Sequence, residues 1–148
     1  NVVGGSVGIA VNAGETSTVT TARVVAQSAS LWLGAGVSLT TLQQHDGTNI
    51  LRCAATTVTV YKGTLATQEV GAITTMNVCG GTAIPNSTGT ITTLNSYGGT
   101  VDLKQSDASR TITTLNKYVG GTINYNKEAV TVTTWAIQDS QNLSGTAA

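Results

Sequence analysis

The chain has 148 residues, the size of one domain, and its 7 basic and 7 acidic residues balance to zero net charge. Charged residues make up only 9% of it and form no basic stripe, so we expect no nucleic acid partner. No apolar run approaches the roughly 18 residues that span a bilayer, so we expect no membrane partner either. The 17 glycines, abundant threonines and single proline indicate an all-β chain with many turns.

Residues 1–18, NVVGGSVGIAVNAGETST, precede the repeats and form a segment of their own. Val7, Ile9 and Val11 alternate with smaller residues, as in a short β-strand. Two roles stay open for this segment: an arm that adds a strand to a neighbouring sheet, or a cap on the first coil of a stacked fold. The three apolar residues are therefore candidate partner-contact residues.

From position 19 onward, a phrase of one apolar residue and two threonines recurs to the end of the chain. The clearest copies are ITTLNSYGGTVDL at 91–103 and ITTLNKYVGGTINY at 112–125. Seven copies begin at positions 19, 39, 55, 73, 91, 112 and 132, so the period runs from 16 to 21 residues. Such a period, rich in β-branched residues and glycine, is typical of a stacked repeat fold.

Aligning the copies places like residues in columns. Two apolar columns are predicted to fill the interior: Val19, Leu39, Ala55, Ile73, Ile91, Ile112 and Val132, and Ala22, Leu42, Val58, Met76, Leu94, Leu115 and Trp135. A glycine column of Gly47, Gly63, Gly81 and Gly99 continues at Gly120 or Gly121. It predicts corners with positive φ, which glycine adopts at little cost.

These columns predict a single-stranded parallel β-helix of about seven coils, formed by residues 19–148 with a polar lid from about 138. Each coil is expected to hold three short strands, the second of them at Leu94–Tyr97 in the clearest copy. The handedness of parallel crossovers favours a right-handed coil. An antiparallel sandwich is the alternative, but sandwiches repeat less regularly.

Two further columns bear on function. Adjacent strand residues point to opposite faces, so one row of the paired threonines is expected to point inward or to lie at a corner. This geometry favours a stabilising role for the threonines over ice binding. The other column is a candidate aromatic row for partner contact, although its rings could simply cover a corner. It reads Val25, His45, Tyr61, Cys79, Tyr97, Tyr118 and Gln138.

No motif points to catalysis. The chain has one histidine and therefore no His/Cys cluster with metal-ligand spacing. Its acidic residues occupy scattered repeat positions, unlike the paired carboxylates of glycosidases. We expect no enzyme activity, no catalytic residues, no metal and no cofactor. Cys53 and Cys79 are expected to be free thiols.

The phrases TITTLNSYGGTVDL and TLNKYVGGTINY resemble the short β-helical repeats of tailed-bacteriophage virion proteins, and the resemblance covers residues 19 to about 138. It implies a non-enzymatic capsid decoration, or cement, protein on the capsid surface, a homotrimer bound to the major capsid protein. The alternative that it implies is a tail fibre or spike module that contacts host glycan. An ice-binding or surface-adhesion β-solenoid also stays open as a third class.

Overall fold

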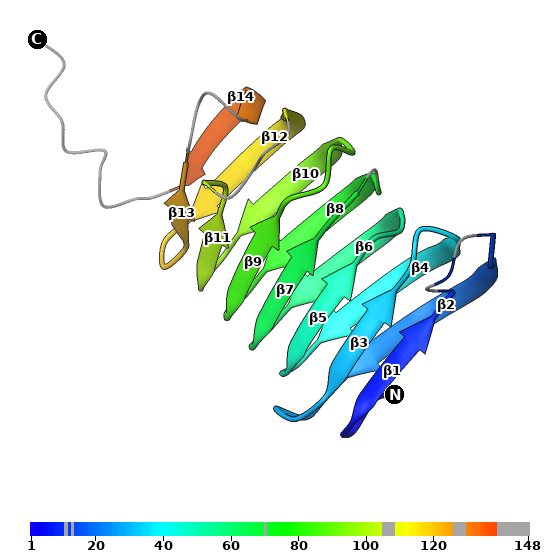
Figure 1. Ribbon diagram of the computed structural model, residues 1–148. Coiled ribbons are helices and arrows are strands. Elements are labelled where there is room, and N and C mark those ends of the chain that lie inside the picture. The colour runs from blue at the N-terminus through cyan, green and yellow to red at the C-terminus, as the bar shows by residue number, and fades with distance from the viewer. Residues whose placement is uncertain (11, 13, 70, 105–108, 126–129, 139–148) are drawn as a thin grey trace, which may run out of the picture.

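The computed structural model describes residues 1–10, 12, 14–69, 71–104, 109–125 and 130–138. These residues form 14 strands in two seven-stranded sheets, and the chain alternates between the sheets at each successive strand from β2 on (Figure 1). Every strand pairs in parallel with the strands of the neighbouring coils. The predicted parallel β-helix is therefore confirmed.

The even-numbered strands form one sheet, called sheet A here. They are β2 (Ser17–Val24), β4 (Val37–Gln44), β6 (Ala55–Val60), β8 (Ile73–Val78), β10 (Ile91–Ser96), β12 (Arg110–Tyr118) and β14 (Val130–Gln138). The odd-numbered strands form sheet B. They are β1 (Ser6–Ile9), β3 (Ser30–Leu33), β5 (Thr48–Leu51), β7 (Thr64–Thr67), β9 (Thr82–Pro85), β11 (Thr100–Asp102) and β13 (Thr122–Asn124).

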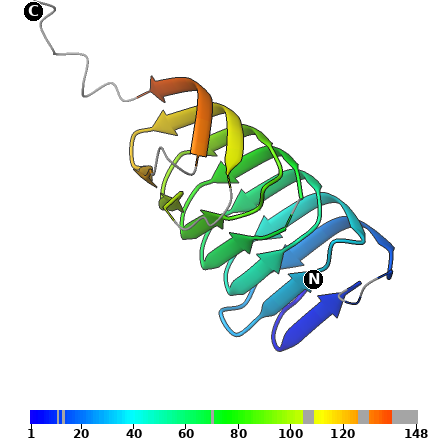
Figure 2. The same ribbon diagram turned by 45° about the horizontal axis from the view of Figure 1, so that its top comes forward.

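Successive copies of the repeat pair like with like. In sheet A, Ile91 lies beside Ile73 on one side and Ile112 on the other, as the sequence alignment predicted. The described chain forms six complete coils, from β2–β3 to β12–β13, rather than the seven predicted, because the seventh copy of the repeat contributes only β14 there; β1 precedes the first coil. The view of Figure 2 shows these coils as flattened loops stacked along one axis.

The prediction of three strands per coil is wrong, because each coil holds two. Residues 91–96 form one strand, and Leu94 lies inside it rather than starting a second. Ile91 and Leu94 are both buried although three residues apart, which a straight strand does not allow. The pairing skips Thr92, so the strand bends at Thr92–Thr93 without breaking. One threonine row was expected to point inward or to lie at a corner of the coil, and this corner lies within a strand.

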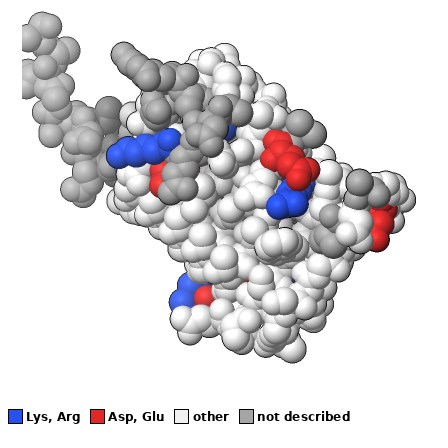
Figure 3. All heavy atoms as spheres, in the orientation of Figure 1, with Lys and Arg blue, Asp and Glu red and all other residues white. Residues whose placement is uncertain are grey.

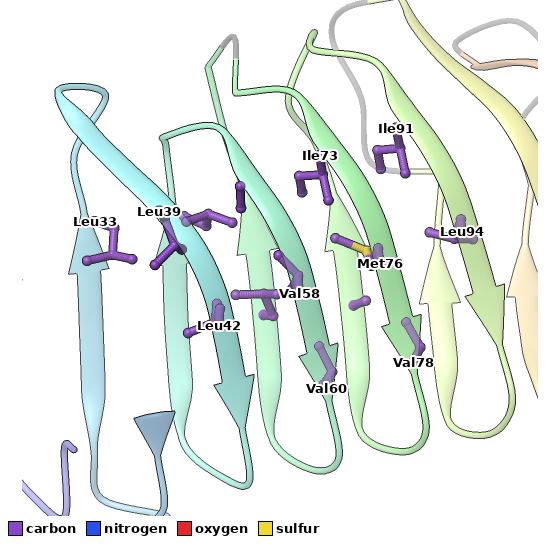
Figure 4. Close-up of a cluster of buried hydrophobic side chains, with 14 of the residues drawn as sticks. Leu33, Leu39, Leu42, Val58, Val60, Ile73, Met76, Val78, Ile91 and Leu94 are labelled. Atoms are coloured by element: carbon purple, nitrogen blue, oxygen red, sulfur yellow. The ribbon is translucent and has the colours of Figure 1, made fainter. Parts of the chain in front are cut away.

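The interior is a continuous apolar column between the two sheets (Figure 4). Ile91, Leu94, Ile112 and Leu115 are 0–1% exposed, so the two predicted core columns are confirmed in the middle coils. The prediction fails for Trp135, which is 43% exposed. It stands on β14, the last strand of sheet A in the described chain, so no further described strand covers it.

The glycine column behaves as predicted. Gly47, Gly63, Gly81, Gly99 and Gly120 all have positive φ, and Gly120 rather than Gly121 takes that conformation in its coil. The coils also approach closely here, since a Cβ built on Gly99 would lie 2.5 Å from the carbonyl oxygen of Gly81. Both the conformation and the close approach therefore require glycine.

The N-terminal segment is part of the stack. β1 pairs in parallel with β3, with Val7 opposite Leu31 and Ile9 opposite Leu33. Val2 forms a further bridge with Val24. The segment thus lies against the first coil, in the place where a cap would lie.

Candidate functional site

An aromatic ridge runs along the edge where the strands of sheet A turn toward sheet B. We define it as His45, Tyr61, Cys79, Tyr97 and Tyr118. The first four directly follow their strands, and Tyr118 is the last residue of β12. The backbone repeats as well: the amides of Tyr61, Cys79 and Tyr97 each donate to the carbonyl of the preceding coil at 2.8 Å. This shared geometry places the side chains in one line.

The ridge contains two stacked ring pairs. The rings of His45 and Tyr61 lie 4.7 Å apart at 14°, and those of Tyr97 and Tyr118 lie 4.4 Å apart at 23°. Tyr61 and Tyr97 are each 45% exposed, so both pairs present ring surface to solvent. Burial, followed by the contact with Tyr118, raises the pKa of the Tyr97 hydroxyl. The predicted outward aromatic row is therefore present in the structure.

Cys79 separates the two ring pairs. It is an exposed free thiol, and Cys53 is a buried free thiol, so the expectation of two unbridged cysteines is confirmed. Burial raises the pKa of both thiols, that of Cys53 to about 11. A thiol that stays protonated near neutral pH is a poor nucleophile.

An ion pair fixes the turn beside His45. Lys62 Nζ donates to Asp46 Oδ2 at 2.8 Å across neighbouring coils, and the Gly47 amide donates to Asp46 Oδ1 at 2.8 Å. These hydrogen bonds hold the pKa of Asp46 below its usual value, with Lys62 the larger cause. The pair therefore ties together the two turns that carry His45 and Tyr61.

The N-terminal candidates do not join the ridge. Val7 is 38% exposed and Ile9 is half-buried against the core, both on β1 in sheet B. Their register with Leu31 and Leu33 continues the inward-facing columns. Val11 lies outside the described residues. The placement of Val7 and Ile9 suits a cap better than a free arm.

Neither threonine row points inward. The first row, Thr20, Thr40, Thr56, Thr74, Thr92, Thr113 and Thr133, is exposed throughout. In the second row, Thr21 and Thr134 are exposed, and the five members between them are half-exposed. The bend at the threonine pair turns both side chains outward. The argument that adjacent threonines must face opposite ways therefore fails here.

A ladder of asparagines follows the second threonine row on the outer face of sheet A. Asn95 Nδ2 donates to Asn77 Oδ1 at 2.9 Å, and Asn116 Nδ2 donates to Asn95 Oδ1 at 2.7 Å. The column passes through Thr59 in the coil before. Sequence reasoning overlooked this ladder, although the repeated Asn at one repeat position was the available signal. The outer face thus carries an ordered array of hydroxyl and amide groups.

Charge is sparse on the surface of Figure 3, where lysine, arginine and carboxylate side chains form only a few small groups. Among the described residues, no group of three His, Cys, Asp or Glu could hold a metal ion. The described part of the chain also has no helix that is long and apolar enough to cross a membrane.

Sequence reasoning also missed Trp32. It lies on β3 between two buried leucines and is 46% exposed on the outer face of sheet B. The alternation in Ser-Leu-Trp-Leu was the signal that could have placed it outside. Arg52, from the next coil, lies over its ring at 5.5 Å from the centroid.

The chain matches no protein-family model, no curated protein and no solved structure.

Proposed function

We propose that this chain is a non-enzymatic virion structural protein, a capsid decoration or cement protein of a tailed bacteriophage. It binds the outside of the shell as a homotrimer and contacts the major capsid protein. The observation that carries the proposal is the aromatic ridge. Its exposed rings, Tyr61 and Tyr97, stand in fixed line on a rigid stack, and aromatic residues dominate the energy of protein contacts.

The rigidity of the stack supports this role. Each coil is hydrogen-bonded to its neighbours through both sheets, and the core is filled from Leu31 to Leu115. Such a solenoid keeps its surface groups at constant spacing, so little conformational entropy is lost when a partner binds the ridge. The resemblance of the repeat to virion proteins supports the proposed location on the capsid surface.

Immunogold labelling of virions tests the setting. Antibodies raised against the purified chain are applied to particles of the phage that carries this sequence. Label over the shell supports the decoration role. Label confined to the tail rejects it in favour of the fibre or spike alternative, and particles without label reject both.

Ice binding is a second candidate, favoured by one observation: the first threonine row is exposed, and the second, half-exposed in the middle coils, pairs in register from coil to coil. Threonine has few rotamers, so such an array is well ordered and can hold ordered water. Thermal hysteresis and ice recrystallisation assays test it. Activity that disappears in Thr56→Lys/Thr74→Lys, with the fold retained, would support ice binding, and inactivity of the parent chain would reject it.

A further inference from the structure

The outer face of sheet B carries an exposed indole, Trp32, that the core does not need. Its neighbours on β3, Leu31 and Leu33, are 2% and 1% exposed, whereas Trp32 is 46% exposed. Leaving a large aromatic side chain in water forfeits the gain of burial. An indole in this position is therefore suited to contact something outside the chain.

The two sides of the indole differ. Trp32 pairs in register with Gly8 on β1 and with Ile50 on β5. Gly8 has no side chain, so the ring borders a hollow of about 350 Å³ on the β1 side. Ser6, Val7, Gly8 and Ser30 line it together with Trp32. This volume falls in the range of about 300–1,000 Å³ that is common for small-ligand sites.

Arg52 braces the indole from the β5 side. Its guanidinium carbon lies 5.5 Å from the ring centroid, within the range of a cation–π contact. Arg52 Nε donates to Gln68 Oε1 at 3.1 Å and lies 3.5 Å from Glu69 Oε1. These contacts hold the guanidinium against the ring, and Glu69 offsets its charge.

Glu69 is itself held in an unusual backbone conformation. Its φ is +60°, a region that non-glycine residues seldom adopt. The amide and hydroxyl of Thr88 both donate to the Glu69 carbonyl, at 2.7 and 3.2 Å. Strained residues of this kind persist where the surroundings fix them, and they cluster at binding sites. The indole is thus held by Arg52 on the β5 side and borders the hollow on the β1 side.

We propose that the hollow beside Trp32 binds one neutral sugar unit of a glycan. A pyranose ring has an apolar C–H face that can lie against the indole and a rim of hydroxyls that can bond to Ser6 and Ser30. The residues that line the hollow carry no charge, and the charge of Arg52 is offset, so a neutral sugar is matched better than an anion. This site lies on the outer face of sheet B, whereas the aromatic ridge lies along the edge where sheet A turns toward sheet B.

Two tryptophans make the test direct, because the chain holds only Trp32 and Trp135. In Trp135→Phe, Trp32 is the single indole, and its fluorescence is titrated with maltohexaose, cellohexaose, chitohexaose and mannohexaose. A saturable spectral change with at least one of these probes is expected. The absence of any saturable change with all four overturns the proposal.

Isothermal titration with the responding probe then assigns the site. Trp32→Ala should weaken binding roughly tenfold or more, a change that corresponds to about 1.4 kcal/mol or more, while Trp32→Phe keeps part of the affinity. Ser30→Ala should weaken it by a smaller factor. Trp135→Ala is the matched control, since Trp135 is 43% exposed at the other end of the stack, and should bind as the parent does.

Circular dichroism and melting curves show that each variant folds. Equal affinity of Trp32→Ala and the parent overturns the sugar site. So does a parent that is oligomeric in sedimentation and dissociates on Trp32→Ala without binding sugar, because the hollow then contacts a second copy of the chain. Since these assays use the isolated chain, their outcome is independent of where the protein lies on a virion.

Discussion

Ile91 and Leu94 both point into the core although they are three residues apart in one strand, at 1% and 0% exposure. The strand achieves this by bending at Thr92–Thr93, and the bend turns both threonines outward. One local deviation from strand geometry thus sets both the core and the outer hydroxyl array. It recurs in every coil because the apolar-Thr-Thr phrase recurs.

Replacing Leu94 by Asp tests the core directly. The carboxylate would be buried among apolar side chains without a partner, so we expect the free energy of unfolding to fall by several kcal/mol. Urea denaturation measures this change. Thr92→Asp is the matched control two residues away, and its exposed side chain should change stability by less than about 1 kcal/mol. Equal losses in the two variants would contradict the assignment of inner and outer positions.

Two buried amides should respond in opposite directions. Gln44 is fully buried, its Oε1 has no hydrogen-bond partner among the described residues, and its column neighbours are Val24 and Val60. Gln44 Nε2 donates to the Gly47 carbonyl at 3.1 Å, and this carbonyl also accepts from the Thr64 amide at 2.8 Å, so it keeps a donor in Gln44→Leu. Because the variant removes the unpaired oxygen, we expect the free energy of unfolding to rise by about 1 kcal/mol in urea denaturation.

Asn49 differs from Gln44 because its Oδ1 accepts from the Leu31 amide at 2.8 Å. Asn49→Leu leaves this buried amide without its acceptor, and we expect a loss of about 1 kcal/mol. If both variants gained stability, the Asn49 hydrogen bond would have no net value.

Two glycines with positive φ, Gly99 in the glycine column and Gly5 before β1, should differ in what substitution costs. Gly99 has φ of +66°, and an added Cβ would lie 2.5 Å from the Gly81 carbonyl oxygen. Gly5 has φ of +70° with no atom within 4 Å of such a Cβ. Gly5→Ala should cost about 1–2 kcal/mol from conformation alone, and Gly99→Ala about 3 kcal/mol or more. Similar melting temperatures for the two variants would contradict this prediction. They would show that neighbouring coils can move apart at Gly99 to make room for the added Cβ at little cost.

The sequence predicted the stack, its register and its glycine corners because a repeat that pairs like with like fixes all three. It did not predict two strands per coil, because a bend inside a strand and a gap between strands leave the same polar interruption in the pattern. Trp135 was assigned to the core from its column, and its exposure reflects its place on the last described strand of sheet A. Trp32 and Arg52 come from different coils and unlike repeat positions, so no column connects them.

Burial of Cys53 gives the stability a defined dependence on pH. The pKa of this thiol is about 11 in the folded chain, against 9.0 as its ordinary value. The contribution of the buried, protonated Cys53 thiol to folding stability is fully present below pH 9. It is lost as the pH rises to about 11, because the thiol of the unfolded chain ionises first and this favours the unfolded state. Relative to Cys53→Ala, the free energy of unfolding should fall by about 2 kcal/mol over this interval.

Alkylation provides the control for this prediction. With iodoacetamide at pH 8, the exposed Cys79 should be modified in the folded protein and Cys53 only after unfolding. Mass spectrometry of the peptides distinguishes the two. Rapid modification of Cys53 in the folded chain would show that its thiol is accessible.

Cosedimentation with capsid shells tests the central claim most directly, namely that the ridge attaches the protein to the shell. Under the proposed function a tailed phage encodes this chain, and shells of that phage are mixed with the parent chain, with Tyr61→Ser/Tyr97→Ser, and with Trp135→Ser as a control. We predict saturable binding of the parent and the control, and binding weaker by roughly 100-fold or more for the double variant with its fold intact. A parent chain that does not sediment with shells, or a double variant that binds like the parent, would contradict the account.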